Sequence, residues 1–255
     1  MRYGLLLLLL ALTASAQAFD ARGHALICQM AYDQLSRTVQ ARVDALIAKS
    51  PEKSFANACA WPDKARDLKE YQHTRTWHFV NVARDAVQVK PADCPATGCL
   101  MSAIPQMQLR LRDNPNNDWG ALLFLSHFIA DLHQPMHVSY FDDRGGNRTS
   151  ITFHGKKMNL HHVWDGELLG SYKWRAKSQA LNAQISAEQQ HAWAAGDLYQ
   201  WANESLAITR SIYVRLPKSK KWGDSEQDYF APLLQLQIQK ASVRLAYLLN
   251  TELAD

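Results

Sequence analysis

Long apolar runs, strong charge of one sign and low-complexity tracts are all missing from this sequence beyond its first residues. No stretch after residue 12 approaches the length of a bilayer span, so we expect no membrane anchor. Glycine (11 residues) and proline (9 residues) are sparse and show no repeat, which excludes a collagen-like chain. Removing Arg2 lowers the net charge from +4 to +3 (27 basic minus 24 acidic residues), which permits a polyanionic partner without indicating one.

The first 18 residues have the layout of a secretory signal. Arg2 precedes an apolar run over residues 5–12, and the small residues Ala16-Gln17-Ala18 follow. The run is too short to cross a bilayer. We therefore predict a signal peptide over residues 1–18 and a secreted or periplasmic mature chain, 19–255, that begins at Phe19. Apolar residues make up 47% of the chain, enough for the core of one domain.

Only four cysteines are present, and in an exported protein they suggest two disulfides. Three pairings are conceivable. Cys94 and Cys99 can close on each other because Pro95 and Gly98 favour a turn between them, which leaves Cys28 for Cys59. Paired C-x-x-C knuckles are absent, which argues against a zinc ribbon.

Helical periodicity dominates the chain. Apolar residues recur at helical spacing over residues 25–35, 39–47, 187–213 and 227–250, and the last two segments are separated by polar residues 217–224. The segment 119–133 is apolar almost all round, which predicts a helix buried on every side. A strand is indicated at 149–153, with turns on both sides. The sequence predicts one mainly α domain with one small β-hairpin.

Two His-x-x-x-Asp pairs are the most informative residues. His127 and Asp131, four apart on a helix, stack on one face, and His161 and Asp165 repeat the spacing. One such pair is more often an ion pair on a helix surface or a satisfied core histidine. Two pairs, one of them inside an apolar helix, favour a metal, because a buried carboxylate is costly unless its charge is compensated. Imidazole and carboxylate together suit zinc.

Other candidates stand alone in the sequence. His137 lies on a different helical face from His127, but Pro135 ends the helix and lets His137 turn back. His24, Asp63 and His78 are further candidate ligands, and each also has an ordinary interpretation: a surface histidine, a helix cap after Pro62 and a packed histidine. His133 faces away from Asp131, so we interpret it as a supporting or core residue.

Several motifs in one order resemble the S1/P1 nuclease family. They are Phe19-Asp-Ala-Arg-Gly-His24, Trp61-Pro-Asp63-Lys-Ala-Arg66, Trp77-His78-Phe79-Val80-Asn81, the segment 127–137, Gly145-Gly146-Asn147 and the segment 159–165. The resemblance covers essentially the whole mature chain. It implies a helical domain of the phospholipase C/P1 nuclease type. It also implies a secreted endonuclease with three zinc ions, which cuts single-stranded DNA and RNA to 5′-phosphorylated products and has 3′-nucleotidase activity.

The resemblance further implies a ligand set for each of three zinc ions (Zn²⁺). The first set is Asp63, His78, His127 and Asp131; the second is His137, His161 and Asp165; the third is His24, Asp131 and the amino nitrogen and carbonyl oxygen of Phe19. A free chain end has a pKa of about 7.7–8.0, so the amine released by cleavage can become a neutral ligand. The family usually has tryptophan at this first position.

Catalytic and substrate-binding roles follow from the same resemblance. We expect Asp63 to hold and deprotonate the attacking water and Arg66 to neutralise charge on the phosphate, although a surface arginine is the ordinary interpretation. Phe79 is the candidate for stacking on a base, with core packing as the alternative. Asn81 stands where the family often has aspartate, which leaves base preference open. The expected partners are single-stranded DNA and RNA and mononucleotides, bound by a monomer.

Two other functions compete with the nuclease. Zinc phospholipase C resembles this family in fold and metal count, but its last ligand pair is His-x-x-x-Glu, whereas this chain has His161 and Asp165. A periplasmic zinc-binding protein without catalysis would prefer closed metal sites or a flexible histidine-rich tract, and neither is evident in the sequence.

Overall fold

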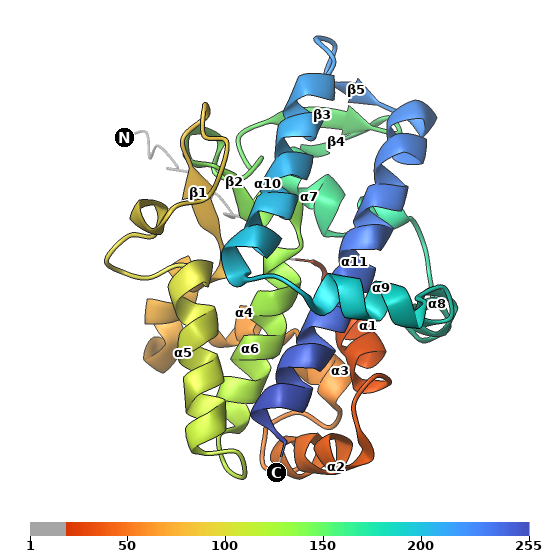
Figure 1. Cartoon of the computed structure of the whole chain (residues 1–255). Coiled ribbons are helices and arrows are strands. Elements are labelled where there is room, and N and C mark those ends of the chain that lie inside the picture. The colour runs from red at the N-terminus through yellow and green to blue at the C-terminus, as the bar shows by residue number, and fades with distance from the viewer. Residues whose placement is uncertain (1–18, 255) are drawn as a thin grey trace, which may run out of the picture.

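A computed structural model describes residues 19–254, and helices make up most of it (Figure 1). The predicted signal peptide, residues 1–18, lies outside the described residues, and the division into leader and domain stays a prediction. The α-helices are α1 (Ala21–Tyr32), α2 (Arg37–Ile47), α3 (Phe55–Ala58), α4 (Trp61–Ala65), α5 (Leu100–Asp113), α6 (Trp119–Leu132), α7 (Leu160–Asp165), α8 (Trp174–Asn182), α9 (Ala187–Ala194), α10 (Leu198–Arg215) and α11 (Asp224–Glu252).

Short 3₁₀-helices and strands connect these helices. The 3₁₀-helices are η1 (Lys69–His78), η2 (Pro91–Asp93), η3 (Pro135–His137), η4 (Phe141–Asp143) and η5 (Glu167–Leu169). The strands are β1 (Val80–Val82), β2 (Val138–Tyr140), β3 (Ser150–Phe153), β4 (Lys156–Asn159) and β5 (Lys221–Trp222). The mainly α prediction is confirmed.

Helix α6 runs through the middle of the molecule between α5 and α11 (Figure 1). Asp118 begins it by accepting a hydrogen bond from the Ala121 main-chain N–H, and every residue from Ala121 to Leu132 is buried. The prediction of a helix buried on all sides is confirmed. Because α6 is covered from every direction, a side chain on it is held in one position, which suits a binding site.

The predicted hairpin is formed by the antiparallel strands β3 and β4. The other strands were not predicted. Strand β5 pairs in parallel with β3, giving the order β4-β3-β5, and β1 pairs in parallel with β2. Strands of two or three residues are too short to show alternation in a sequence, and a parallel pair joins segments far apart in the chain.

One helix prediction needs correction. The segment 187–213 is not one helix, because α9 ends at Ala194 and α10 begins at Leu198. Ala195 after α9 is extended, with ψ 161°, and Gly196 follows with φ 92°, which no α-helix adopts; Asp197 then caps α10 by accepting from the Gln200 N–H. The polar segment 217–224 holds β5 as well as a loop.

Both predicted disulfides are present. Cys28–Cys59 ties α1 to the residue that follows α3, and Cys94–Cys99 closes a short loop before α5. Cys59 also accepts a hydrogen bond through its carbonyl oxygen from the His127 Nδ1–H, at 2.7 Å. The first disulfide therefore lies directly behind a candidate metal ligand.

Replacing Cys28 and Cys59 by alanine should lower the free energy of unfolding by about 3–4 kcal/mol, because the disulfide closes a loop of 31 residues in the unfolded chain. Denaturant unfolding measures this difference. Replacing Cys94 and Cys99, which are 5 residues apart, is the matched control and should cost about 2 kcal/mol. Equal losses for the two pairs would contradict this account.

Candidate metal centre

Eight predicted ligand side chains come from six elements and meet in the interior. They are His24 on α1, Asp63 on α4, His78 at the end of η1, His127 and Asp131 on α6, His137 at the end of η3, and His161 and Asp165 on α7. None of them is more than 8% exposed. So many titratable groups are rarely buried together without a compensating partner.

Asp131 lies at the centre of the first group. One of its carboxylate oxygens is 3.1 Å from His78 Nδ1 and 3.1 Å from His127 Nε2, and these two nitrogens are 2.9 Å apart. Asp63 Oδ1 is 3.7 Å from each of the same nitrogens. The four predicted ligands of the first site therefore converge on one small volume.

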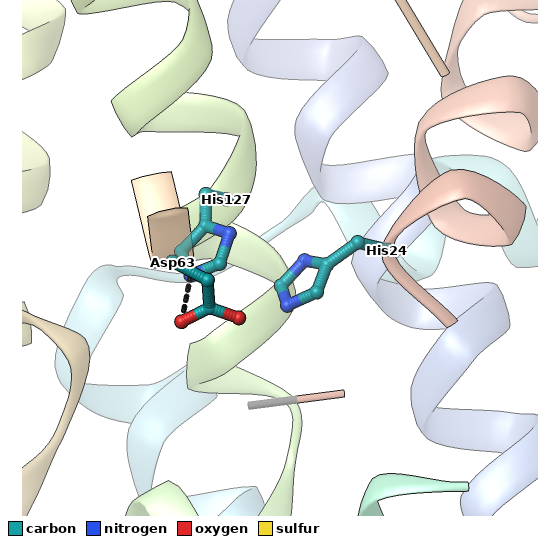
Figure 2. A group of neighbouring side chains, drawn as sticks. All are labelled: His24, Asp63 and His127. Carbon is teal, nitrogen blue, oxygen red and sulfur yellow. Dashed lines mark ion pairs between the residues drawn. The ribbon is translucent and has the colours of Figure 1, made fainter. Parts of the chain in front are cut away.

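His24 approaches the same carboxylate from the other side. Its Nε2 is 3.6 Å from the second oxygen of Asp131, and its ring stacks on that of His127 at 4.0 Å. Figure 2 shows His24, Asp63 and His127 facing one another, a further group whose donor atoms could share a metal. Phe19 is fully buried, and its ring lies edge-on to His24. Asp131 thus stands between two sets of ligands, as a bridging residue would.

The third group consists of His137, His161 and Asp165. Their donor atoms lie close together: His137 Nε2 is 3.2 Å from His161 Nε2, which is 3.6 Å from Asp165 Oδ1. Helix α6 ends at Leu132, and Pro135 opens the 3₁₀ turn that carries His137 back toward α7. The predicted reversal of the chain at Pro135 is confirmed.

Main-chain carbonyls fix the protonation of three histidines. Each Nδ1–H donates to a carbonyl oxygen: His127 to Cys59 at 2.7 Å, His137 to His78 at 2.5 Å and His161 to Gly145 at 2.6 Å. A neutral imidazole that donates through Nδ1 keeps its lone pair on Nε2. All three lone pairs therefore point into the clusters, in the arrangement that metal-binding histidines use.

Unpaired polar atoms show that a metal fits this centre. Within residues 19–254, buried atoms without a hydrogen-bond partner include both ring nitrogens of His24, Nε2 of His78 and one oxygen each of Asp63 and Asp131. Each buried polar atom without a partner costs about 1–3 kcal/mol. Cations bound among them would satisfy the carboxylate oxygens and one ring nitrogen of His24, and a set of imidazoles and carboxylates is the donor set that zinc prefers.

Burial sets the direction of the pKa shift at four groups of the centre. It raises the pKa of Asp131 to about 6, although His127 opposes the shift, and it raises the pKa of Asp165 well above its usual range. It also lowers the pKa values of His24 and His137 well below their usual range. Neutral histidine is the form that binds a metal, so these imidazoles are already in their ligand state at neutral pH.

A cleft of about 740 Å³ opens onto the centre. The predicted ligands His78, His137 and His161 line it, together with three arginines, Arg66, Arg144 and Arg148, and one acid, Asp93. Arg66 is buried rather than on the surface, and its guanidinium lies 3.1 Å from Asp63 Oδ1. A cleft with a net positive lining and a metal centre at its wall suits a phosphate-bearing substrate.

A family model described as S1/P1 Nuclease matches residues 19–254. The chain belongs to the S1/P1 nuclease family. It is similar to Endonuclease 4 of Arabidopsis thaliana, with 28% identity over 96% of this chain and 92% of that protein. It is also similar to Nuclease P1 of Penicillium citrinum, with 27% identity over 91% of this chain and 97% of that protein. The protein is therefore a nuclease, and its substrate is nucleic acid.

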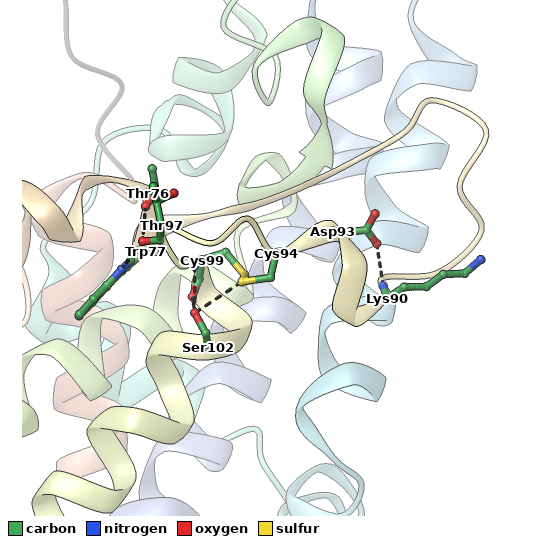
Figure 3. Close-up of a disulfide and its surroundings, with 8 residues drawn as sticks. All are labelled: Thr76, Trp77, Lys90, Asp93, Cys94, Thr97, Cys99 and Ser102. Carbon is green, nitrogen blue, oxygen red and sulfur yellow. Dashed lines mark hydrogen bonds between the residues drawn. A yellow bond between two sulfur atoms is a disulfide. The ribbon is translucent and has the colours of Figure 1, made fainter.

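The predicted base-binding residues lie at the cleft of this nuclease. Phe79, the residue before β1, and Asn81, within β1, both line the cleft and are partly exposed. The segment that carries Phe79 is attached to the disulfide loop 94–99 (Figure 3): Thr97 O accepts from Trp77 Nε1 at 3.1 Å and from Thr76 Oγ1 at 3.2 Å. The carbonyl oxygen of Phe79 accepts from the Leu100 N–H at 3.2 Å. The disulfide loop thus supports the cleft wall.

Two supporting residues of the nuclease were missed in the sequence. Gln134 is fully buried and donates through Nε2 to Asp165 Oδ1 at 2.8 Å, which orients that carboxylate. Gly145 has φ 62°, and a Cβ there would lie 2.3 Å from the Met136 carbonyl oxygen, so only glycine brings its own carbonyl to His161. The Gly-Gly-Asn motif is a signal for the role of Gly145, but no spacing in the sequence indicates the role of Gln134.

His133 does not take part in the metal centre. It is buried, donates through Nδ1 to the Ile129 carbonyl oxygen at 2.7 Å and accepts from Arg244 at 2.8 Å. Arg244 in turn bonds Glu204. Burial and the neighbouring Arg244 lower the pKa of His133 to about 3, so it stays neutral. The interpretation of His133 as a supporting or core residue agrees with these contacts, which join α6 to α11.

No helix among residues 19–254 combines the length and the hydropathy that crossing a bilayer requires.

Proposed function

We propose that the mature chain is an exported zinc endonuclease that holds three zinc ions and hydrolyses phosphodiester bonds in single-stranded DNA and RNA. The expected products carry 5′-phosphates, and 3′-nucleotides are further substrates. The observation that carries the proposal is the buried set of histidine and aspartate atoms without hydrogen-bond partners, placed at the wall of a cleft lined by arginines. The two disulfides are typical of a protein that works outside the cytoplasm.

The ligand sets proposed for the three ions are those that the family resemblance implies. Bound zinc lowers the pKa of water, polarises the phosphate and stabilises the leaving oxygen. For the third ion, the free amine of Phe19 requires removal of the leader, so export and activation would coincide.

Asp63 and Arg66 are proposed to handle the reacting atoms. Asp63 has one carboxylate oxygen near His78 and His127 and can receive a proton from the attacking water. Arg66 lies beside Asp63 and lines the cleft, where its planar donors can bind the phosphate as negative charge builds up.

The preference for single strands is proposed to arise at Phe79. A base must leave its stack before it can lie on a protein ring, and duplexes resist this. Phe79 is partly exposed and lines the cleft, which places an aromatic side chain within reach of a base. Asn81, close by on β1, offers both a donor and an acceptor to a base edge, which fits broad rather than strict base choice.

Incubating the mature protein with single-stranded DNA, single-stranded RNA, duplex DNA and phosphatidylcholine tests the proposal. We expect hydrolysis of both single strands, much slower hydrolysis of the duplex and none of the lipid. Hydrolysis of the lipid alone would show a phospholipase C. No hydrolysis in buffer with excess zinc would favour a zinc-binding protein without catalysis.

Chelating the metal should lower the melting temperature of the protein by at least about 10 °C. Without a cation, the carboxylates of Asp131 and Asp165 stay buried without full compensation, and zinc that binds only the folded state stabilises it by several kcal/mol. At this size each kcal/mol corresponds to about 2–4 °C. Calorimetry with and without chelator measures the shift, and zinc but not magnesium should reverse it. An unchanged melting temperature would contradict a structural contribution of zinc.

A further inference from the structure

Five lysines gather on the β4-β3-β5 sheet and the loop before β5. They are Lys156, Lys157, Lys218, Lys220 and Lys221, and all five are exposed. Within the described part of the chain, none of their side chains has an ion pair or a hydrogen bond. The sheet lies at the opposite end of the molecule from α2 (Figure 1).

The pairing of the strands places two of these lysines on one face. Thr152 on β3 is opposite Lys157 on β4 and opposite Lys221 on β5, so all three side chains project to the same side. The next pair, Phe153 and Trp222, is buried on the other side. Lys157 and Lys221 therefore point away from the core, two strand spacings or about 10 Å apart. We call this outer side the lysine face.

The lysine face continues into the cleft. Ser150 and Asn159 are opposite each other on the same side of the sheet, two residues from Thr152 and Lys157, which is about 7 Å. The Asn159 Nδ2–H₂ donates to Asn147 Oδ1 at 3.3 Å, and Asn147 lines the cleft. A chain that leaves the cleft past Asn147 thus meets Lys157 next.

The nearby acids do not neutralise the lysine face. Asp224 is 3.7 Å from His154 Nδ1, and Glu226 accepts the Gly223 N–H at 2.9 Å. Lysines that repel one another and stabilise no acid contribute nothing evident to folding. Their arrangement beside a substrate cleft matches the basic surfaces that follow a nucleic-acid backbone.

We propose that the lysine face binds the phosphates of a single nucleic-acid strand where it leaves the cleft. The proposal rests on the proposed function, because the strand is the one that the centre cuts. Its consequence is a preference for long strands over short ones that comes from charge and does not depend on sequence. Each phosphate contact of this kind makes binding salt-dependent: the logarithm of the binding constant falls against the logarithm of the salt concentration with a slope of about −0.7 per contact for single strands.

Neutralising the face with the double variant Lys157→Gln/Lys221→Gln tests the proposal. The substrates are a 30-nucleotide thymidine strand and a thymidine dinucleotide, each measured at 50 and 200 mM salt. Each phosphate contact changes binding about threefold between 50 and 200 mM salt, so the loss of two contacts should make the variant's deficit in kcat/KM on the long strand about sevenfold larger at 50 mM than at 200 mM. The loss should shrink at 200 mM, and kcat/KM on the dinucleotide should stay unchanged.

A matched control is Lys53→Gln/Lys173→Gln, which removes the same charge from two exposed lysines. Lys53 lies just before α3 and Lys173 just before α8, and both helices lie away from the sheet (Figure 1). It should behave like the unmodified protein. An equal loss in both double variants, or none in the Lys157 and Lys221 variant, would overturn the proposal while the nuclease still cuts the dinucleotide. If the unmodified protein cuts neither substrate, the proposed function fails instead.

Discussion

Replacing Asp131 with alanine should leave the nuclease with one zinc ion per chain instead of three. The carboxylate lies 3.1 Å from His78 and from His127 on one side and 3.6 Å from His24 on the other, so it serves two of the proposed sites at once. The remaining site, of His137, His161 and Asp165, has its own three donors and should keep its ion.

Elemental analysis of the purified variant measures the zinc content directly. Activity on single-stranded DNA should fall by at least about 10³-fold, because the proposed charge stabilisation at the phosphate is lost with the two ions. Asp143→Ala is the matched control: it removes another buried carboxylate, which bonds Thr149 and Tyr213, and should keep all three ions. Three ions in the Asp131 variant would refute the bridging role.

Adding one glycine before Phe19 should remove one zinc ion and lower activity by at least about 10²-fold. Phe19 is buried beside His24, and the main chain that follows it is fixed, since the Asp20 N–H donates to the Asp165 carbonyl oxygen at 2.9 Å. A longer chain end would turn the proposed amine ligand into an amide, which is a poor zinc ligand.

Cleavage of two precursors by a defined protease yields one protein that begins at Phe19 and one that begins with the added glycine. Zinc content and turnover are measured on each protein. Phe19→Trp is the control, since it keeps the amine in place and restores the residue that the family usually has there. It should bind three zinc ions. Unchanged turnover and zinc content in the glycine-extended protein would show that the chain end plays no part.

Local patterns predicted the parts of the site that depend on local geometry. A spacing of four residues places His127 beside Asp131 and His161 near Asp165 in any helix, and the structure has both pairs. The apolar run around His127 likewise predicted a buried helix. The family resemblance supplied what spacing could not, namely that His24, Asp63 and His78 come to the same carboxylate from three other segments.

The remaining features depend on contacts between distant segments. Strand β1 pairs in parallel with β2, and Val80 is opposite Val138. The pairing brings together the residues that precede the two strands, so the His78 carbonyl oxygen accepts a hydrogen bond from the His137 Nδ1–H. The lysine face arises only because β5 pairs with β3. A run of lysines in a sequence indicates a solvated surface, and only the register shows that Lys157 and Lys221 point the same way.

The most direct test of the account is a crystal structure of the mature chain, beginning at Phe19, with anomalous scattering measured at the zinc absorption edge. We expect three peaks: one among His137, His161 and Asp165, and two on either side of Asp131, of which one contacts the amine of Phe19. Peaks elsewhere, or an Asp131 carboxylate bound to no metal in the presence of excess zinc, would contradict the account.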